Sequence, residues 1–386
     1  MKQRIEFVSK LMLPGLFLCY AAFANVSMLV DGEFSGVKEA DQPLLAGGLT
    51  KGMDKVYKDN LPHMTPAIGL LGAVRYQLLG IGKPGVVVGK DEWFFTKEEF
   101  APKTNAPSQI DRAIREIEAV KDELDGAGIK LVVVPLPYKT DIYADVLNKR
   151  VSSQEATLHY RNFIDRLAGA EIPFIDTRDS LIKARAKGEV FFKTDTHWTP
   201  LGAESVAREI AGSVALPEGI EPSDFELIAT KHRTFWGDLV RFVTNEDFGE
   251  WAGLNKESAT LWQAEQTMPQ QAVLDLFASD DAFPVILVGT SYSANPNWSF
   301  AEFLKHHMKV DVINHAKEGQ GPGTPMYDYL KSDDFQQTPP RLVIWEIPTR
   351  YIAQDDIWAQ APKKAAPQTQ PSSTAKHTTG GKDDVS

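Results

Sequence analysis

The sequence has little cysteine and no excess of positive charge, and both absences exclude classes of function. Its 386 residues include a single cysteine, Cys19, which lies in an apolar N-terminal run. One cysteine cannot form a disulfide framework within the chain or a cysteine-based zinc site, and we do not consider it a nucleophile. The formal net charge of −11 disfavours nonspecific binding to nucleic acid or to other polyanions.

The N-terminus has the pattern of a targeting segment. Three basic residues lie within the first ten positions, an apolar run follows from residue 11 to 30, and Ala22-Phe23-Ala24 has small side chains at its two ends. Basic residues before an apolar core are typical of a secretory signal. A run of about 20 residues is also long enough to span a bilayer as a helix. We therefore expect residues 1–30 to be a signal or anchor, with the protein in the periplasm and attached to the inner membrane by this segment unless it is cleaved.

The rest of the chain divides into an arm, an α/β region and a tail. Turn residues and short helical patterns predict an N-terminal arm at residues 31–84. Residues 85–356 alternate apolar strand-like runs with helical patterns, which predicts a parallel sheet covered by helices on both faces. Within them, the less periodic residues 216–280 are an expected insertion. The last segment, 357–386, has almost no large apolar side chains and is predicted to be disordered.

Hydrophobic periodicity locates the strands of the α/β region. Short, β-branched apolar runs predict strands, and apolar residues at helical spacing predict helices. The predicted strands include residues 129–137, 172–177, 285–288, 309–316 and 340–352. Thr199 followed by Pro200 predicts the start of a helix, because threonine caps helix N-termini and proline suits the first helical position.

A candidate nucleophile follows the strand at 285–288. The strand runs into Gly289-Thr290-Ser291, and a serine on a glycine turn between strand and helix is typical of α/β hydrolytic folds. Glycine permits the tight turn, and backbone N–H groups beyond it can stabilise an oxyanion. Ser291 is therefore the candidate nucleophile, and Ser293 is a rival that lies further from the strand end.

A candidate base lies in a second segment, "FFKTDTHWTP". Asp195 and His197 are two residues apart, so in an extended chain their side chains point to the same side. Asp195 can then accept a hydrogen bond from one ring nitrogen of His197 and leave the other nitrogen for Ser291. Taken alone, the pair would more often be two polar loop residues, and a metal site would need further ligands that no nearby cluster supplies. With Ser291, the pair predicts a Ser-His-Asp triad that requires no metal or soluble cofactor.

Six segments together resemble a known family: "VVVGKDEWFF", "VVPLPYKTDIY", "KTDTHWTPLG", "GTSYS", "INHAKEGQGP" and "VIWEIPTRY". They are similar to the SGNH-hydrolase-like alginate O-acetyltransferases, the family of AlgJ, AlgX and AlgV, over roughly residues 60–355. The resemblance implies an SGNH-hydrolase-like fold with its motifs in circularly permuted order, since Asp195 and His197 precede Ser291. It implies transfer of acetyl groups to mannuronate hydroxyls of alginate during alginate biosynthesis. The implied partners are a membrane-bound O-acyltransferase as acetyl donor and other alginate acetylation and export proteins.

The resemblance also suggests groups around the triad. Gly319 corresponds to a glycine whose N–H faces the oxyanion. The family pattern G-x-N-D supplies an asparagine donor, but this chain has P-T-R-Y there, so Arg350 or Tyr351 is the expected substitute. Tyr292 either lines the acceptor site or packs inside the protein. Lys139 follows the end of a strand, where α/β folds place binding groups, and is a candidate to bind an acceptor carboxylate.

Two other functions stay open from the residues alone. A carbohydrate acetylesterase would use the same triad with water as the acceptor, and only exclusion of water and binding of sugar would separate the two activities. A non-catalytic scaffold for polysaccharide or export proteins belongs to a different class, which an intact triad disfavours. For either sugar-binding function, the net charge of −11 requires a local group of basic residues where the polyanion binds.

Overall fold

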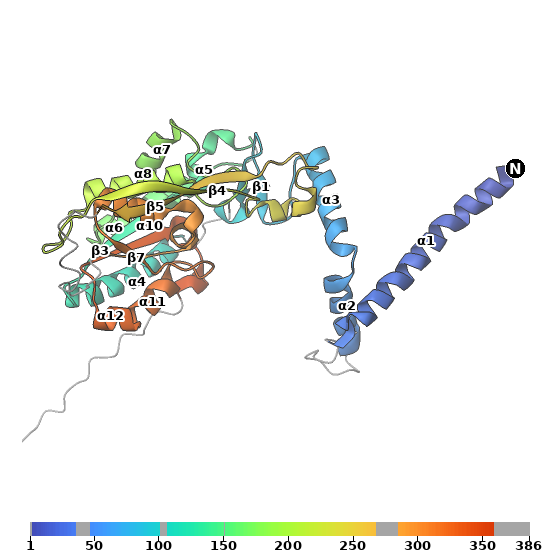
Figure 1. Ribbon diagram of the computed structural model, residues 1–386, viewed down its shortest axis with the longest axis horizontal. Coiled ribbons are helices and arrows are strands. Elements are labelled where there is room, and N and C mark those ends of the chain that lie inside the picture. Colours follow the sequence, from blue (N-terminus) through green and yellow to red (C-terminus); the bar gives the residue numbers. More distant parts are fainter. Residues whose placement is uncertain (1, 36–46, 101–105, 150, 268–284, 359–386) are drawn as a thin grey trace, which may run out of the picture.

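The computed structural model describes residues 2–35, 47–100, 106–149, 151–267 and 285–358 (Figure 1). The predicted disordered tail therefore lies, from residue 359 onward, outside the described residues. Just before that point, a 3₁₀ helix, η10 (Asp355–Trp358), buries Trp358 against the ring of Trp345.

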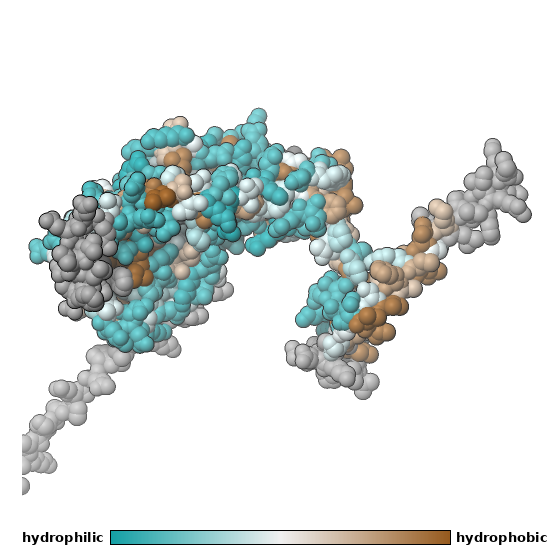
Figure 2. Space-filling model, viewed as in Figure 1, coloured by the Kyte–Doolittle hydropathy of each residue, from teal (hydrophilic) through white to brown (hydrophobic). Residues whose placement is uncertain are grey.

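Three helices form an arm that projects from the α/β body (Figure 1). They are α1 (Lys2–Val30), α2 (Gly48–Asn60) and α3 (Met64–Leu79). Figure 2 shows hydrophobic surface on α1 and α3, and the exposed apolar side chains on these helices include Leu16, Phe17, Leu18, Phe23, Leu29, Val30, Leu71, Leu78 and Leu79. Within the described ranges, no helix combines the length and apolarity required to span a membrane.

Small residues on one face of α3 join the arm to the body. Gly69 and Gly72 are buried on α3, and a Cβ at Gly72 would lie only 2.2 Å from the carbonyl oxygen of Val243. The Thr244 hydroxyl donates a hydrogen bond of 2.8 Å to the carbonyl of Gly69. Glycine at these positions therefore allows the close backbone approach.

The body contains a four-stranded parallel sheet with strand order β3-β8-β6-β7. The strands are β3 (Lys130–Leu136), β6 (Val285–Val288), β7 (Val312–Asn314) and β8 (Leu342–Pro348). β6 and β8 are buried along their whole length, as expected for strands with helices on both faces. The parallel α/β sheet is therefore confirmed.

Helices cover the two faces of this sheet. Alternate residues of β3 belong to different core clusters: Val132 and Val134 to one, Leu131 and Val133 to the other. The first cluster is covered by α7 (Arg178–Arg185), α8 (Pro200–Ser213) and α10 (Phe300–Met308). The second is covered by α4 (Ala106–Gly126), α6 (Gln154–Gly169) and α11 (Gly323–Leu330).

One predicted strand is wrong. Residues 172–177 form only a single parallel bridge, between Phe174 and Val133 at the outer edge of β3. The N–H of Val133 donates to the carbonyl of Pro173, and the N–H of Ile175 donates to the carbonyl of Val133. Pro173 has no N–H of its own, so the pairing does not extend into a ladder.

Two antiparallel hairpins lie outside the main sheet. β1 (Val86–Val88) pairs with β2 (Phe94–Thr96), and both strands start within the segment "GVVVGKDEWFF". β4 (Phe225–Phe235) pairs with β5 (Glu257–Gln266) inside the residues expected to be an insertion.

The remaining short helices are η3 (Lys97–Phe100), α5 (Lys139–Ile142), η4 (Ala144–Val146), η5 (Val240–Phe242), η6 (Glu246–Phe248), α9 (Ser291–Ala294), η8 (Pro296–Trp298), α12 (Asp333–Gln337) and η9 (Thr349–Tyr351).

Candidate active site

The structure brings the three predicted triad residues together from segments far apart in the chain. Ser291 begins α9 directly after the β6 turn. Asp195 and His197 lie in the loop before α8, whose start is fixed by Thr199: its hydroxyl accepts a hydrogen bond from the N–H of Gly202, and Pro200 is the first helical residue. The predicted start of this helix is therefore confirmed.

The three side chains form a continuous chain of hydrogen bonds. The His197 Nε2 lies 2.7 Å from the Ser291 Oγ, and the His197 Nδ1 lies 2.6 Å from the Asp195 Oδ1. The backbone N–H of His197 donates to the same carboxylate oxygen at 2.9 Å. With the Nδ1 proton directed at Asp195, Nε2 is free to accept the proton of the Ser291 hydroxyl, which is the arrangement that activates a serine nucleophile.

Asp195 is held in its ionised form. Burial acts to raise its pKa, but the charge of His197 and the hydrogen bonds from the His197 side chain and from the N–H groups of Asp238 and His197 outweigh burial and place the pKa of Asp195 at about 2. In Ser-His-Asp triads, a buried carboxylate at this position fixes the imidazole orientation and stabilises an imidazolium.

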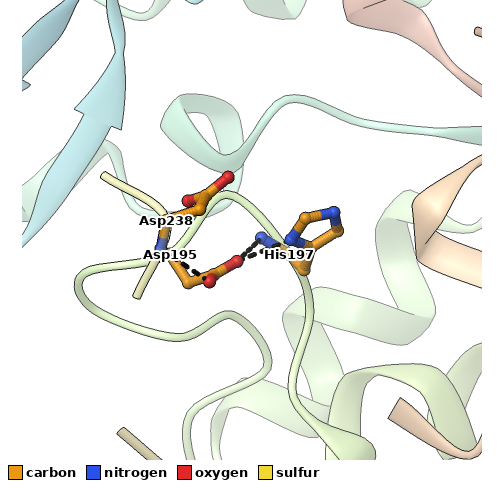
Figure 3. A group of neighbouring side chains, drawn as sticks. All are labelled: Asp195, His197 and Asp238. Carbon is orange, nitrogen blue, oxygen red and sulfur yellow. Dashed lines mark hydrogen bonds and ion pairs between the residues drawn. The ribbon is translucent and has the colours of Figure 1, made fainter. Parts of the chain in front are cut away.

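Asp238, which the sequence patterns did not single out, supports the other side of the Asp195 carboxylate. Its N–H donates to the Asp195 Oδ2 at 2.9 Å (Figure 3). Its own carboxylate accepts from the N–H of Thr196 at 2.8 Å and from the Thr196 hydroxyl at 2.6 Å. Asp195 and Thr196 are thus both hydrogen-bonded to Asp238.

Asp195, His197 and Asp238 also form a group that could hold a metal ion, since their ligand atoms lie within 4.8 Å of one another (Figure 3). Each of these side chains is already used in the hydrogen bonds described above, which come from N–H groups and a hydroxyl. Hydrogen bonding among these residues and Thr196 therefore gives the cluster a role that needs no metal ion.

Trp298 is a further neighbour of the triad that sequence reasoning missed. Its ring stacks on the His197 imidazole with centroids 5.2 Å apart and planes inclined by 23°. Its indole N–H donates to the carbonyl of Ser291 at 3.1 Å. The tryptophan therefore contacts both His197 and Ser291, and no local motif around "NPNWS" indicates this.

The predicted role of Lys139 as an exposed carboxylate-binding residue is wrong. Its side chain is 1% exposed, and its ammonium donates to the carbonyls of Phe94, Lys193 and Asp195 at 2.6, 2.9 and 2.9 Å. Burial lowers the pKa of Lys139 to about 8. All three donors of the ammonium are used to join β2 to the loop of the triad, so the residue is structural.

Tyr292 packs inside the protein and does not line an acceptor site. It is 4% exposed, its hydroxyl donates to the carbonyl of Thr196 at 2.7 Å, and its ring lies edge-on to Trp198.

The guanidinium of Arg350 lies over the Tyr292 ring at 5.4 Å and donates to the Tyr351 hydroxyl at 3.1 Å. Among the described residues, the buried Arg350 Nε has no hydrogen-bond partner.

The two remaining candidates differ in their surroundings. Gly319 lies in an exposed turn after β7 with a φ of +72°, a backbone conformation that favours glycine. Its role as an oxyanion donor stays a prediction. Ser293 is 3% exposed and its hydroxyl donates to the Glu346 carboxylate at 3.0 Å, whereas His197 contacts Ser291. The geometry therefore favours Ser291 over its rival as the nucleophile.

Comparisons with known proteins agree with this fold. Residues 86–349 match the model of a family described as the SGNH hydrolase-like domain of acetyltransferase AlgX. A probable alginate O-acetylase AlgJ of Pseudomonas fluorescens is 38% identical over 317 residues, which cover 81% of this chain and 80% of the relative. The O-acetyltransferase domain of Pseudomonas putida AlgJ aligns in structure with a TM-score of 0.63 and 34% identity, over 70% of this chain and 93% of that one.

A second solved structure, Pseudomonas aeruginosa AlgX, aligns with a TM-score of 0.56 and 26% identity, over 72% of this chain and 65% of that one. Together with the parallel sheet and its helices, these similarities confirm the SGNH-hydrolase-like fold that the sequence motifs predict.

Proposed function

The chain belongs to the family of AlgX-type SGNH hydrolase-like acetyltransferases, and from this premise we propose that it acetylates mannuronate hydroxyls of alginate through an acetyl-enzyme on Ser291. It is an O-acetyltransferase of alginate biosynthesis, as its relatives named alginate O-acetylase indicate. The roles of its residues are inferred from the geometry of the site.

In the first half of the proposed reaction, the Ser291 Oγ attacks the carbonyl carbon of an acetyl donor. The serine proton moves to the His197 Nε2, which lies 2.7 Å away. Asp195 stabilises the resulting imidazolium through its 2.6 Å contact with Nδ1. The tetrahedral intermediate then collapses, the leaving group takes the proton from His197, and the acetyl group stays on Ser291.

In the second half, a mannuronate hydroxyl replaces the donor. It loses its proton to the His197 Nε2 as its oxygen attacks the acetyl carbonyl, and the bond to the Ser291 Oγ breaks as that oxygen regains a proton from His197. No cofactor takes part in either half. Gly319, Arg350 and Tyr351 are the candidates to stabilise the negative oxygen of the two intermediates.

Arg350 is the stronger of the two side-chain candidates in this set. The residue is partly exposed, its guanidinium lies beside Tyr292, the residue after the proposed nucleophile, and its Nε is a buried donor without a partner in the described part of the chain. A cation with an unused donor, beside the residue that follows the proposed nucleophile, suits an oxyanion or the carboxylate of a uronic acid. It also supplies the local positive charge that a protein of net charge −11 needs to bind a polyanion.

The observation that carries this proposal is the continuous chain of hydrogen bonds from Asp195 through His197 to Ser291. Its test is the transfer of acetyl from p-nitrophenyl acetate to purified oligomannuronate, followed by mass spectrometry of the products. We expect no acetylated product from Ser291→Ala and reduced but measurable product from the matched variant Ser293→Ala. Full activity of Ser291→Ala would contradict the proposal.

The same assay separates the transferase from the esterase alternative. An acetylesterase would release acetate at an equal rate with and without oligomannuronate and would leave the sugar unmodified. Membership of the acetyltransferase family favours transfer, and we expect acetylated oligomannuronate as the main product when the sugar is present. A scaffold without catalytic activity would show neither product.

We further propose that the enzyme works in the periplasm and receives acetyl groups from a membrane-bound O-acyltransferase, together with other alginate acetylation and export proteins. The basic and apolar pattern of the first 30 residues supports export, and the relatives are proteins of alginate biosynthesis. Attachment to the inner membrane by this segment is a more specific proposal than location in the periplasm. Cell fractionation with N-terminal sequencing decides it: a soluble periplasmic product that begins near Asn25 would show cleavage instead.

A further inference from the structure

A glutamate lies buried behind the nucleophile turn. Glu346 is fully buried in β8, an otherwise apolar strand of sequence LVIWEIP. Its neighbour Trp345 pairs with Val288, the last residue of β6, so Glu346 lies level with the turn that follows β6. A carboxylate in such a place is costly, because burial disfavours its charge, and it therefore calls for an explanation.

The carboxylate accepts hydrogen bonds from residues on both sides of Ser291. Its Oε2 accepts from the N–H of Thr290 at 2.8 Å, from the Thr290 hydroxyl at 3.0 Å and from the Ser293 hydroxyl at 3.0 Å. Its Oε1 receives a longer contact of 3.2 Å from the Thr290 hydroxyl. The bonds fix the residue before the nucleophile and the residue two positions after it.

The glycine of the turn is also explained by this carboxylate. A Cβ added at Gly289 would lie 2.5 Å from the Glu346 Oε2 and 2.9 Å from the Glu346 Cβ. Any larger residue would displace the glutamate or the turn. In the "GTSYS" segment, Gly289, Thr290 and Ser293 therefore all lie against Glu346, whereas the Ser291 hydroxyl is hydrogen-bonded to His197.

We propose that Glu346 is a positioning residue that holds the turn from Gly289 to Ser293, and so keeps the Ser291 hydroxyl in line with the His197 Nε2. The inference rests on the proposed role of Ser291 as nucleophile. Glu346 acts through Thr290 and Ser293 and does not contact the substrate.

Two substitutions at Glu346 test this role. Glu346→Gln keeps the shape and places its carbonyl oxygen where Oε2 accepts its three bonds, so we expect reaction rates within about threefold of the unmodified protein. Glu346→Leu removes every acceptor and frees the turn. Because a misplacement of about 1 Å can reduce a rate about 100-fold, we expect a loss of that order in kcat for p-nitrophenyl acetate, with KM unchanged.

The reactivity of Ser291 itself is measured by its rate of inactivation with phenylmethanesulfonyl fluoride, on full-length protein whose folding is checked by circular dichroism. We expect the rate to follow the same order: near normal for Glu346→Gln and about 100-fold lower for Glu346→Leu. A folded Glu346→Leu protein that reacts at the normal rate would overturn the inference.

Ser293→Ala gives an independent test if Glu346→Leu does not fold. It removes one of the donors to the carboxylate, and we expect a several-fold lower inactivation rate; a normal rate would overturn the inference. Where Glu346→Leu does fold, adding Ser293→Ala to it should not lower the inactivation rate further, because both substitutions remove the same set of hydrogen bonds. If Ser293→Ala lowers the rate as much in the Glu346→Leu protein as it does in the unmodified protein, the inference is also overturned. Ser291→Ala, measured in parallel, separates the two proposals. If Ser291→Ala is inactivated by phenylmethanesulfonyl fluoride at the normal rate, the proposed nucleophile is wrong. If Ser291→Ala does not react but Glu346→Leu reacts at the normal rate, only the positioning role is refuted.

Discussion

Replacing Glu346 by glutamine should change how the stability of the protein depends on pH. Burial is the main cause that raises the pKa of Glu346 from 4.5 to about 7, against its hydrogen bonds with Thr290 and Ser293 and the nearby charge of Arg350. Between these two pKa values the native protein keeps a proton on Glu346 that the unfolded chain has released. The contribution of Glu346 to the free energy of unfolding is therefore fully present below about pH 4.5 and is lost as the pH rises to about 7.

The size of this loss follows from the two pKa values. At 1.36 kcal/mol per pKa unit, a rise from 4.5 to about 7 corresponds to about 3 kcal/mol. Glu346→Gln cannot titrate and keeps the shape of the side chain, so other groups contribute equally to both proteins. The stability of the unmodified protein relative to Glu346→Gln should fall by about 3 kcal/mol over that range.

Urea unfolding followed by tryptophan fluorescence measures this difference, because Trp345 is fully buried next to Glu346 and becomes exposed on unfolding. Both proteins are unfolded at a series of pH values between 4.5 and 8, and the difference between their unfolding free energies is plotted against pH. A difference that stays constant across this range, or that rises with pH, would refute the reasoning.

Three further substitutions have definite expected outcomes. Lys139→Met leaves three backbone carbonyls without their donor, so urea unfolding should show a loss of about 2–4 kcal/mol, and unchanged stability would show that the ammonium contributes little. Asp195→Asn should lower kcat for p-nitrophenyl acetate by about 10³–10⁴-fold through loss of the carboxylate that orients His197, and a fall below tenfold would contradict the triad. Arg350→Gln should reduce acetyl transfer to oligomannuronate more than hydrolysis of the small ester, since water has no carboxylate to bind; equal reductions would assign Arg350 to the oxyanion site or to folding.

The parts of the site that sequence reasoning found are those with local signals. The strand at 285–288 is apolar and β-branched, and the glycine turn after it places Ser291 at the strand end. The spacing of Asp195 and His197 brings both side chains to one side of the chain. These features depend only on neighbours in sequence, so they could be predicted without the fold.

The features that were missed depend on contacts between distant segments. Lys139 follows a strand end and has the sequence environment of an exposed binding residue, but its three acceptors come from β2 and from the triad loop. Trp298 reaches the His197 ring through the fold of residues 291–298. Of these residues, only Glu346 has a local sequence signal, because a single charged residue inside an apolar strand indicates a buried polar partner. Its partners in the turn after β6 could not be predicted from this signal, since they depend on the pairing of β8 with β6.

The most direct test of the central claim is to locate the acetyl group on the enzyme. The full-length protein is mixed with p-nitrophenyl acetate, quenched in acid, digested and analysed by tandem mass spectrometry. The proposed mechanism predicts one acetylated peptide with the modification on Ser291, its disappearance when oligomannuronate is added, and no acetylated serine in Ser291→Ala. Acetyl on another serine, or an acetyl-enzyme that persists in Ser291→Ala, would contradict the mechanism.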